Sequence, residues 1–169
     1  MPPRKPATDA APEPAVPGRP PISRAFLLTQ IGTHAASRFA ERMAALDLLP
    51  QHAGVLRLMA GAAGGISQRR LGEMLGVFPS RMVALVDDLE KRGFVERRDD
   101  PTDRRSYALH LTEQGTRALK DIGKLAREHD EEICAGLNPT EREQLMALLS
   151  RLAAQLGLAP GVHPGYRRL

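Results

Sequence analysis

The positions of the prolines constrain this chain more than any other feature of its sequence. Fourteen prolines occur in 169 residues, and eight of them lie within the first 21. Because proline breaks helix interiors and this segment has few apolar side chains to bury, we predict that residues 1–21 form a disordered tail. Proline elsewhere suits a first helical turn or a tight turn, so each of the other six is expected to mark a boundary. They are Pro50, Pro79, Pro101, Pro139, Pro160 and Pro164.

Between these boundaries, apolar side chains recur mostly with helical spacing. Ser67, Thr112 and Asn138 precede such segments and are suitable N-caps, and Gly76 and Gly93 follow others as C-terminal stops. The spacing predicts helices over 22–46, 50–60, 67–75, 79–92, 112–135 and 139–156.

Between the fourth and fifth predicted helices, the apolar period changes from helical to two. Residues 94–97 alternate as a strand does, and Tyr107, Leu109 and Leu111 repeat the alternation. Residues 99–103 between them are rich in turn-forming side chains. We therefore predict a β-hairpin whose charge is concentrated at its tip. A short helix, a turn, a second helix and this hairpin make a winged helix-turn-helix.

The predicted fold class is thus mainly α with a small β-hairpin wing, an α+β winged helix-turn-helix over residues 48–111. The helices outside this module carry apolar stripes longer than one small module can cover. We therefore predict that residues 22–47 and 112–158 form a helical dimerisation region and that the protein is an obligate-type homodimer. Residues 159–169 are expected to form a C-terminal tail.

Composition argues against several classes of protein. Hydrophobic residues make up 42% of the chain, and no stretch approaches the roughly 18 apolar residues of a membrane span. The N-terminus has no apolar signal region, and the single Cys134 cannot form an internal disulfide. We expect a cytoplasmic protein with no membrane partner.

Motifs for catalysis and metal binding are missing from the sequence. It contains no Gly-rich phosphate loop and no Gly-x-Ser-x-Gly, so we expect no enzyme. The five histidines and Cys134 show no metal-ligand spacing, so no metal and no cofactor is expected.

Net charge points only loosely to nucleic acid. The chain carries a net charge of +4 at pH 7, and 20 of its 24 basic residues are arginine. The arginine side chain forms bidentate hydrogen bonds with phosphates and with the edge of guanine. A GC-rich genome would favour arginine codons as well. The segment from Ser67 to Arg105 contains nine basic and eight acidic residues, so its net charge is close to zero. Affinity for DNA would therefore have to come from the orientation of a few arginine side chains. The candidates are Arg81, Arg98, Arg104 and Arg105.

Several short motifs together resemble the MarR family of winged-helix transcriptional regulators. The resemblance covers roughly residues 22–156. The segments that carry it are Leu49-Pro50-Gln51-His52, Ile66-Ser67-Gln68, residues 85–97, residues 99–106, and Leu111-Thr112-Glu113-Gln114-Gly115.

The resemblance implies a ligand-responsive repressor that binds a pseudopalindromic operator in double-stranded DNA as a dimer. It implies that Ser67 and Gln68 anchor the phosphate backbone and that the start of the 79–92 helix enters the major groove. Many members carry Thr-Arg where this chain has Val83-Ala84, so either Arg81 supplies a base contact instead or few bases are read. The residues expected to face the major groove are Pro79, Ser80, Arg81 and Ala84.

The resemblance also gives roles to the hairpin tip. Arg105 would enter the minor groove, whose negative potential attracts arginine where the groove is narrow. Asp103 would orient the wing by pairing with an arginine there. Arg104 would contact phosphate or take the place of Arg105.

Family members usually hold a small effector between the winged module and the dimer helices. His34 and Arg38, one helical turn apart, and His52 are candidates to line such a cleft and would suit an anionic or aromatic inducer. The simpler interpretation of each residue alone is a packed histidine or a surface charge. Redox-sensing members carry a cysteine near the start of the first helix, and this chain has none there. The alternative function is a dimeric architectural or ligand-independent DNA-binding protein.

Overall fold

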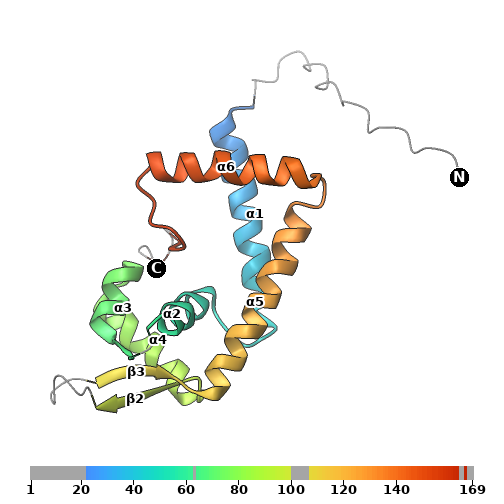
Figure 1. Cartoon of the computed structure of the whole chain (residues 1–169). Helices are drawn as coiled ribbons and strands as arrows, with labels where there is room; N and C mark the ends of the chain where they lie inside the picture. The colour runs from blue at the N-terminus through green and yellow to red at the C-terminus, as the bar shows by residue number, and fades with distance from the viewer. Residues whose placement is uncertain (1–21, 63, 100–106, 164–165, 167–169) are drawn as a thin grey trace, which may run out of the picture. The chain divides into compact units, whose positions relative to one another are not determined.

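The computed structural model of this chain describes residues 22–62, 64–99, 107–163 and 166. The predicted tail over 1–21 and the tip of the predicted hairpin lie outside these residues. The elements, in chain order, are α1 (Arg24–Ala44), α2 (Pro50–Ala60), β1 (Ile66–Ser67), α3 (Gln68–Leu75), α4 (Pro79–Lys91), β2 (Val95–Asp99), β3 (Tyr107–Leu111), α5 (Glu113–Ile133) and α6 (Pro139–Gln155) (Figure 1).

The helix boundaries confirm the capping residues expected from the sequence. The side chains of Ser67, Thr112 and Asn138 each accept a hydrogen bond from the backbone N–H three residues on, at 3.2, 3.0 and 3.0 Å. Each bond satisfies one of the N–H groups that the first helical turn leaves unpaired. At the other end of α3, Gly76 takes a left-handed conformation with φ at 64°, which a residue with a Cβ rarely adopts.

The small sheet has the strand order β1-β3-β2 and is held together by two antiparallel pairings. The predicted hairpin is confirmed: Val95 pairs with Leu111 and Asp99 with Tyr107, so β2 runs two residues further than the alternation suggested. Strand β1 was not predicted. It has only two residues, too few for an alternating pattern, and it exists because Ile66 pairs with Leu109 of β3.

The described chain divides into two compact units, residues 1–34 and 35–169, with the boundary inside α1. In the second unit, one apolar cluster joins α2, α3, α4, the hairpin and α5. Leu56, Leu71, Val86 and Leu89 are fully buried in it, and Ile122 brings α5 onto the same cluster. The core thus holds the helix-turn-helix against the sheet and against the first half of α5.

The start of α5 is fixed on the hairpin by a close backbone approach. The Thr112 hydroxyl donates to the Gly93 carbonyl at 2.6 Å, and the Thr112 N–H donates to the Phe94 carbonyl at 3.1 Å. A Cβ on Gly115 would collide with that same Phe94 carbonyl oxygen. The Leu-Thr-x-x-Gly motif therefore has a physical reason: threonine ties the helix to the hairpin, and glycine leaves room for the contact.

Replacing Gly115 with alanine should lower the free energy of unfolding by about 3 kcal/mol, because the backbone must move to accept the Cβ. Chemical denaturation measures this. Gly123→Ala on the same helix is the matched control, since its Cβ would meet only the Arg127 side chain at 3.6 Å. That variant should gain about 0.5–1 kcal/mol from helix propensity. Equal effects of the two substitutions would contradict this account of the motif.

Candidate nucleic-acid interface

The turn between α3 and α4 sets which face of α4 is free. The Val77 N–H donates to the Gly72 carbonyl at 3.0 Å, which closes the end of α3 and turns the chain into α4. Met82, Leu85 and Leu89 of α4 then pack into the core. The opposite side of its first two turns is left exposed, at Pro79, Ser80, Val83 and Ala84.

Arg81 is the charged member of this surface, and no described carboxylate neutralises it. It is half-buried, its Nε is buried without a hydrogen-bond partner, and none of its nitrogens pairs with a described carboxylate. The first turn of α4 holds no acidic residue, and a helix N-terminus carries partial positive charge. The structure therefore brings together, at the start of one helix, the residues expected to face the major groove.

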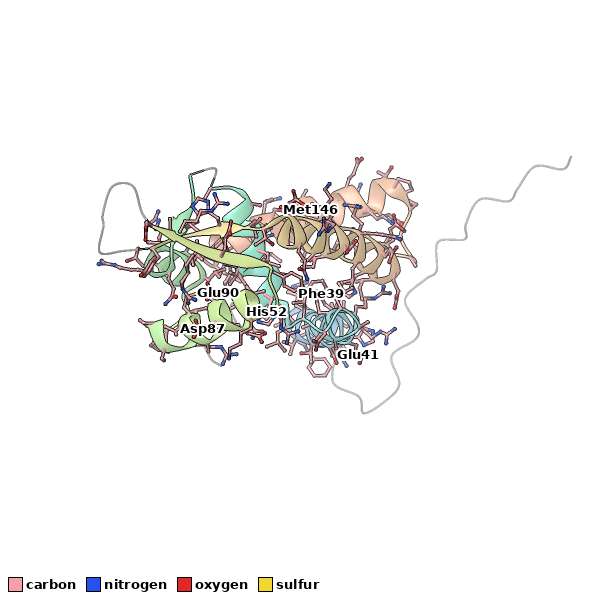
Figure 2. All side chains as sticks on the ribbon, turned by 90° about the horizontal axis from the view of Figure 1, so that it is seen from below. Phe39, Glu41, His52, Asp87, Glu90 and Met146 are labelled. Carbon is pink, nitrogen blue, oxygen red and sulfur yellow. The ribbon has the colours of Figure 1, made fainter. Side chains whose placement is uncertain are left out.

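Most other arginines near α4 are tied to carboxylates. Arg92 bonds to Asp47 at 2.5 Å and to Asp88 at 2.9 Å. Arg97 of β2 bonds to Asp87 at 2.5 Å and also to Glu90, two residues of α4 that are labelled in Figure 2. The Arg92–Asp47 pair links the end of α4 to the loop after α1, and the Arg97 pairs link α4 to the hairpin, so these arginines hold the helix in place.

The other predicted contact residues show mixed placements. Ser67 caps α3 through its oxygen and keeps its O–H free to donate, and Gln68 beside it is half-buried. Arg98 is exposed but bonds to Glu96 at 2.9 Å through its Nε. Such a surface pair contributes little, so a phosphate can replace Glu96. Asp103, Arg104 and Arg105 lie outside the described residues, and their roles stay predictions.

His52, expected at an effector cleft, lies in the core with 2% of its surface exposed. The Nδ1 of His52, which is labelled in Figure 2, accepts a hydrogen bond from the Leu49 N–H at 3.2 Å. Its Nε2 lies 3.4 Å from Asp88 Oδ2. Both ring nitrogens are thus used, one to cap α2 and the other to face α4. Burial lowers the pKa of His52, although the Asp88 charge opposes this.

The other two expected effector residues, Arg38 and His34, both lie on α1. Arg38 bonds to Glu41 at 2.6 Å and lies 3.4 Å from Glu132 of α5. His34 is exposed and belongs to the first unit.

A cavity of about 470 Å³ lies in the second unit against α2 and α5, and none of these three residues lines it. Its walls are mostly apolar; Phe39, labelled in Figure 2, is among them. Arg57 lies at the cavity and donates to the Gly161 carbonyl.

The Tyr166 ring covers Gly54, and its hydroxyl donates to the Pro50 carbonyl at 3.0 Å. Burial raises the pKa of Tyr166. The cavity was not predicted from the sequence, because its walls come from segments more than 100 residues apart.

The described residues provide neither a membrane span nor a metal site. Among them, no helix has both the length and the hydropathy needed to cross a bilayer. No group of three or more His, Cys, Asp or Glu side chains in that part of the chain is arranged to hold a metal ion.

A helix-turn-helix followed by a β-hairpin defines this chain as a winged-helix protein. The MarR family model matches residues 46–106. A MarR family transcriptional regulator from Rhodococcus sp. RHA1 has 30% sequence identity and a TM-score of 0.65, over 76% of this chain and 91% of that one. The chain belongs to the MarR family.

Two further relatives have more specific names. The putative transcriptional regulatory protein for the hcr operon of Thauera aromatica is 38% identical over 102 residues, which is 60% of this chain. The chain covers 61% of that regulator's length. CouR from Rhodococcus jostii RHA1, solved with p-coumaroyl-CoA, has 31% identity and a TM-score of 0.62 over 76% of this chain and 90% of that one. A second CouR structure is bound to a 23-mer DNA duplex.

The thermal stability of this protein should fall as the pH drops below about 6.5, the pKa of an unfolded histidine. Because burial lowers the pKa of His52 in the folded state, the unfolded chain takes up its proton first and is favoured at low pH. His52→Gln keeps an acceptor for the Leu49 N–H but cannot titrate, so its melting temperature should fall less between pH 7.5 and 5.5. The unmodified chain, measured at the same two pH values, is the control. A variant H52Q with the full pH dependence would contradict the role of His52.

Proposed function

We propose that this protein is a sequence-specific DNA-binding transcriptional regulator, a repressor that binds a pseudopalindromic operator as a homodimer. One observation carries the proposal. Of the arginines in α3, α4 and β2 of the described chain, Arg81 alone has no carboxylate partner, and it lies at the exposed start of the second helix of a helix-turn-helix. A helix in this position enters the major groove in proteins of this architecture. A protein with this function works in the cytoplasm and needs no catalytic group.

Exposed apolar surface supports the homodimer. Helix α6 buries none of its residues in the described protomer, and Met146, Leu148 and Leu156 are 62%, 56% and 69% exposed. Figure 2 shows Met146 on this helix. In the first unit, Phe26 and Ile31 are exposed as well. Exposed apolar side chains of this kind mark an interface, and a second copy of the chain would cover them.

Arg81→Ala should weaken binding to an operator selected from random duplexes by about 10- to 100-fold, because one bidentate base contact is lost. Fluorescence anisotropy at fixed salt measures this. Arg127→Ala, on the exposed surface of α5 outside the module, is the matched control and should bind as the unmodified chain does. Equal coating of every duplex, with no selected sequence, would instead support the architectural alternative.

We further propose that the cavity beside α2 and α5 binds a small effector. Its volume of about 470 Å³ lies within the usual range for small-molecule sites, and apolar walls with one guanidinium suit a ligand that has an aromatic body and an anionic end. The p-coumaroyl-CoA bound by CouR supports this ligand class. Because the cavity touches both the module and α5, a ligand that prefers one arrangement of these parts would change DNA affinity.

The two tyrosines of this chain allow a direct test of the cavity. In a Tyr107→Phe protein labelled with 3-fluorotyrosine, the single ¹⁹F signal reports on Tyr166. Titration with 2-naphthoate should shift this signal to saturation, and Arg57→Gln should weaken binding about tenfold by removing the charged partner. A labelled Tyr166→Phe protein, whose signal comes from exposed Tyr107, is the control and should show no shift. No saturable shift with 2-naphthoate or related aromatic acids would favour a ligand-independent regulator.

A further inference from the structure

Three apolar side chains are exposed where α4 begins. Phe78, the N-cap residue, is 69% exposed, Val83 in the second turn is 41% exposed, and Ala84 beside it is exposed too. All three lie next to Arg81, on the surface for which we propose DNA contact. A role for them in operator choice rests on that proposed function and makes it more specific.

Neither helix stability nor core packing explains Phe78 and Val83. Valine is a weak helix former because its branched Cβ restricts the rotamer, and Val83 lies outside the apolar cluster that α4 joins. An N-cap favours Ser, Thr, Asp or Asn, whereas Phe78 makes no side-chain capping bond. Apolar residues at two positions where local energetics favour polar ones indicate a contact outside the protomer.

The polar chemistry of the same surface is limited. Over the first two turns of α4, Ser80 and Arg81 are the side chains that can donate hydrogen bonds. Asp87 begins the next turn, and one of its carboxylate oxygens is held by Arg97 at 2.5 Å. The surface therefore offers one guanidinium and one hydroxyl, surrounded by hydrocarbon.

Base edges in the major groove differ in what they offer to such a surface. Arginine bonds to O6 and N7 of guanine, and the thymine C5-methyl is the apolar group that this groove presents. We infer that Val83, with Ala84 and Phe78 beside it, determines operator choice by packing against thymine methyl groups next to a guanine read by Arg81. Base readout at Val83-Ala84, where many family members carry Thr-Arg, is then apolar.

Base analogues test this inference on the full-length protein. After an operator is selected from random duplexes, each thymine is replaced in turn by deoxyuridine, which lacks only the methyl group, and each guanine by 7-deazaguanine. Loss of one contacted methyl should weaken binding about fourfold per half-site, the value of one buried methyl-sized group. Deoxyuridine at flanking positions should have no effect.

A double-mutant cycle then assigns the contact. Val83→Ala should remove the deoxyuridine penalty at one position of each half-site and keep the 7-deazaguanine penalty, and Arg81→Ala should do the reverse. Val83→Thr, which has the same shape and keeps one methyl, should keep part of the deoxyuridine penalty. The melting temperature of each variant checks that it folds. Because Val83 is 41% exposed, V83A and V83T should melt as the unmodified chain does.

The outcomes separate the two proposals. A selected operator without thymine in the half-site, no deoxyuridine penalty at any position, or the same penalty in V83A and the unmodified chain would each overturn apolar readout. All three leave sequence-specific binding intact. Failure to select any sequence would overturn the proposed function itself.

Discussion

The attachment of α4 to the rest of the second unit is the constraint on which the proposed DNA surface depends. Two arginines hold the helix, Arg97 from β2 and Arg92 at the end of α4 itself. Arg97 reaches across from β2 to Asp87 and Glu90, and Arg92 reaches back to Asp47 and Asp88. Each pair is partly exposed and contributes little stability by itself. Their combined effect is on orientation, since the buried stripe of α4 sets its depth and the ion pairs restrict its rotation and tilt.

Asp47 shows how tightly this attachment is specified. Its φ of 55° is in the left-handed region, the one such value among the described non-glycine residues. The Arg92 guanidinium bonds to both its carboxylate and its backbone carbonyl, the latter at 2.8 Å. An otherwise unfavourable turn after α1 is thus stabilised by the arginine that ends α4. The turn and the helix hold each other in place.

Charge and site assignments from sequence were limited by the same long-range contacts. The segment from Ser67 to Arg105 has nine basic and eight acidic residues, but this count does not show which of them form ion pairs. Arg92 and Arg97 pair with carboxylates, whereas Arg81 has no described carboxylate partner. His52 looked available for a ligand because nothing near it in sequence reveals that Asp88, 36 residues away, faces its ring. The cavity walls were missed for the same reason, since Arg57 and Tyr166 meet only in the folded chain.

Local rules determined the elements of this protein from its sequence. Proline at first turns, Ser67, Thr112 and Asn138 as caps, Gly76 as a stop and the change of apolar period are signals within a few residues, so the helices and the hairpin were predicted correctly. Tertiary structure decided the rest. Strand β1 exists only through its pairing with β3, and which arginines are neutralised depends on partners up to 94 residues away. Backbone preference is short-ranged, whereas burial and ion pairing depend on which distant segments meet.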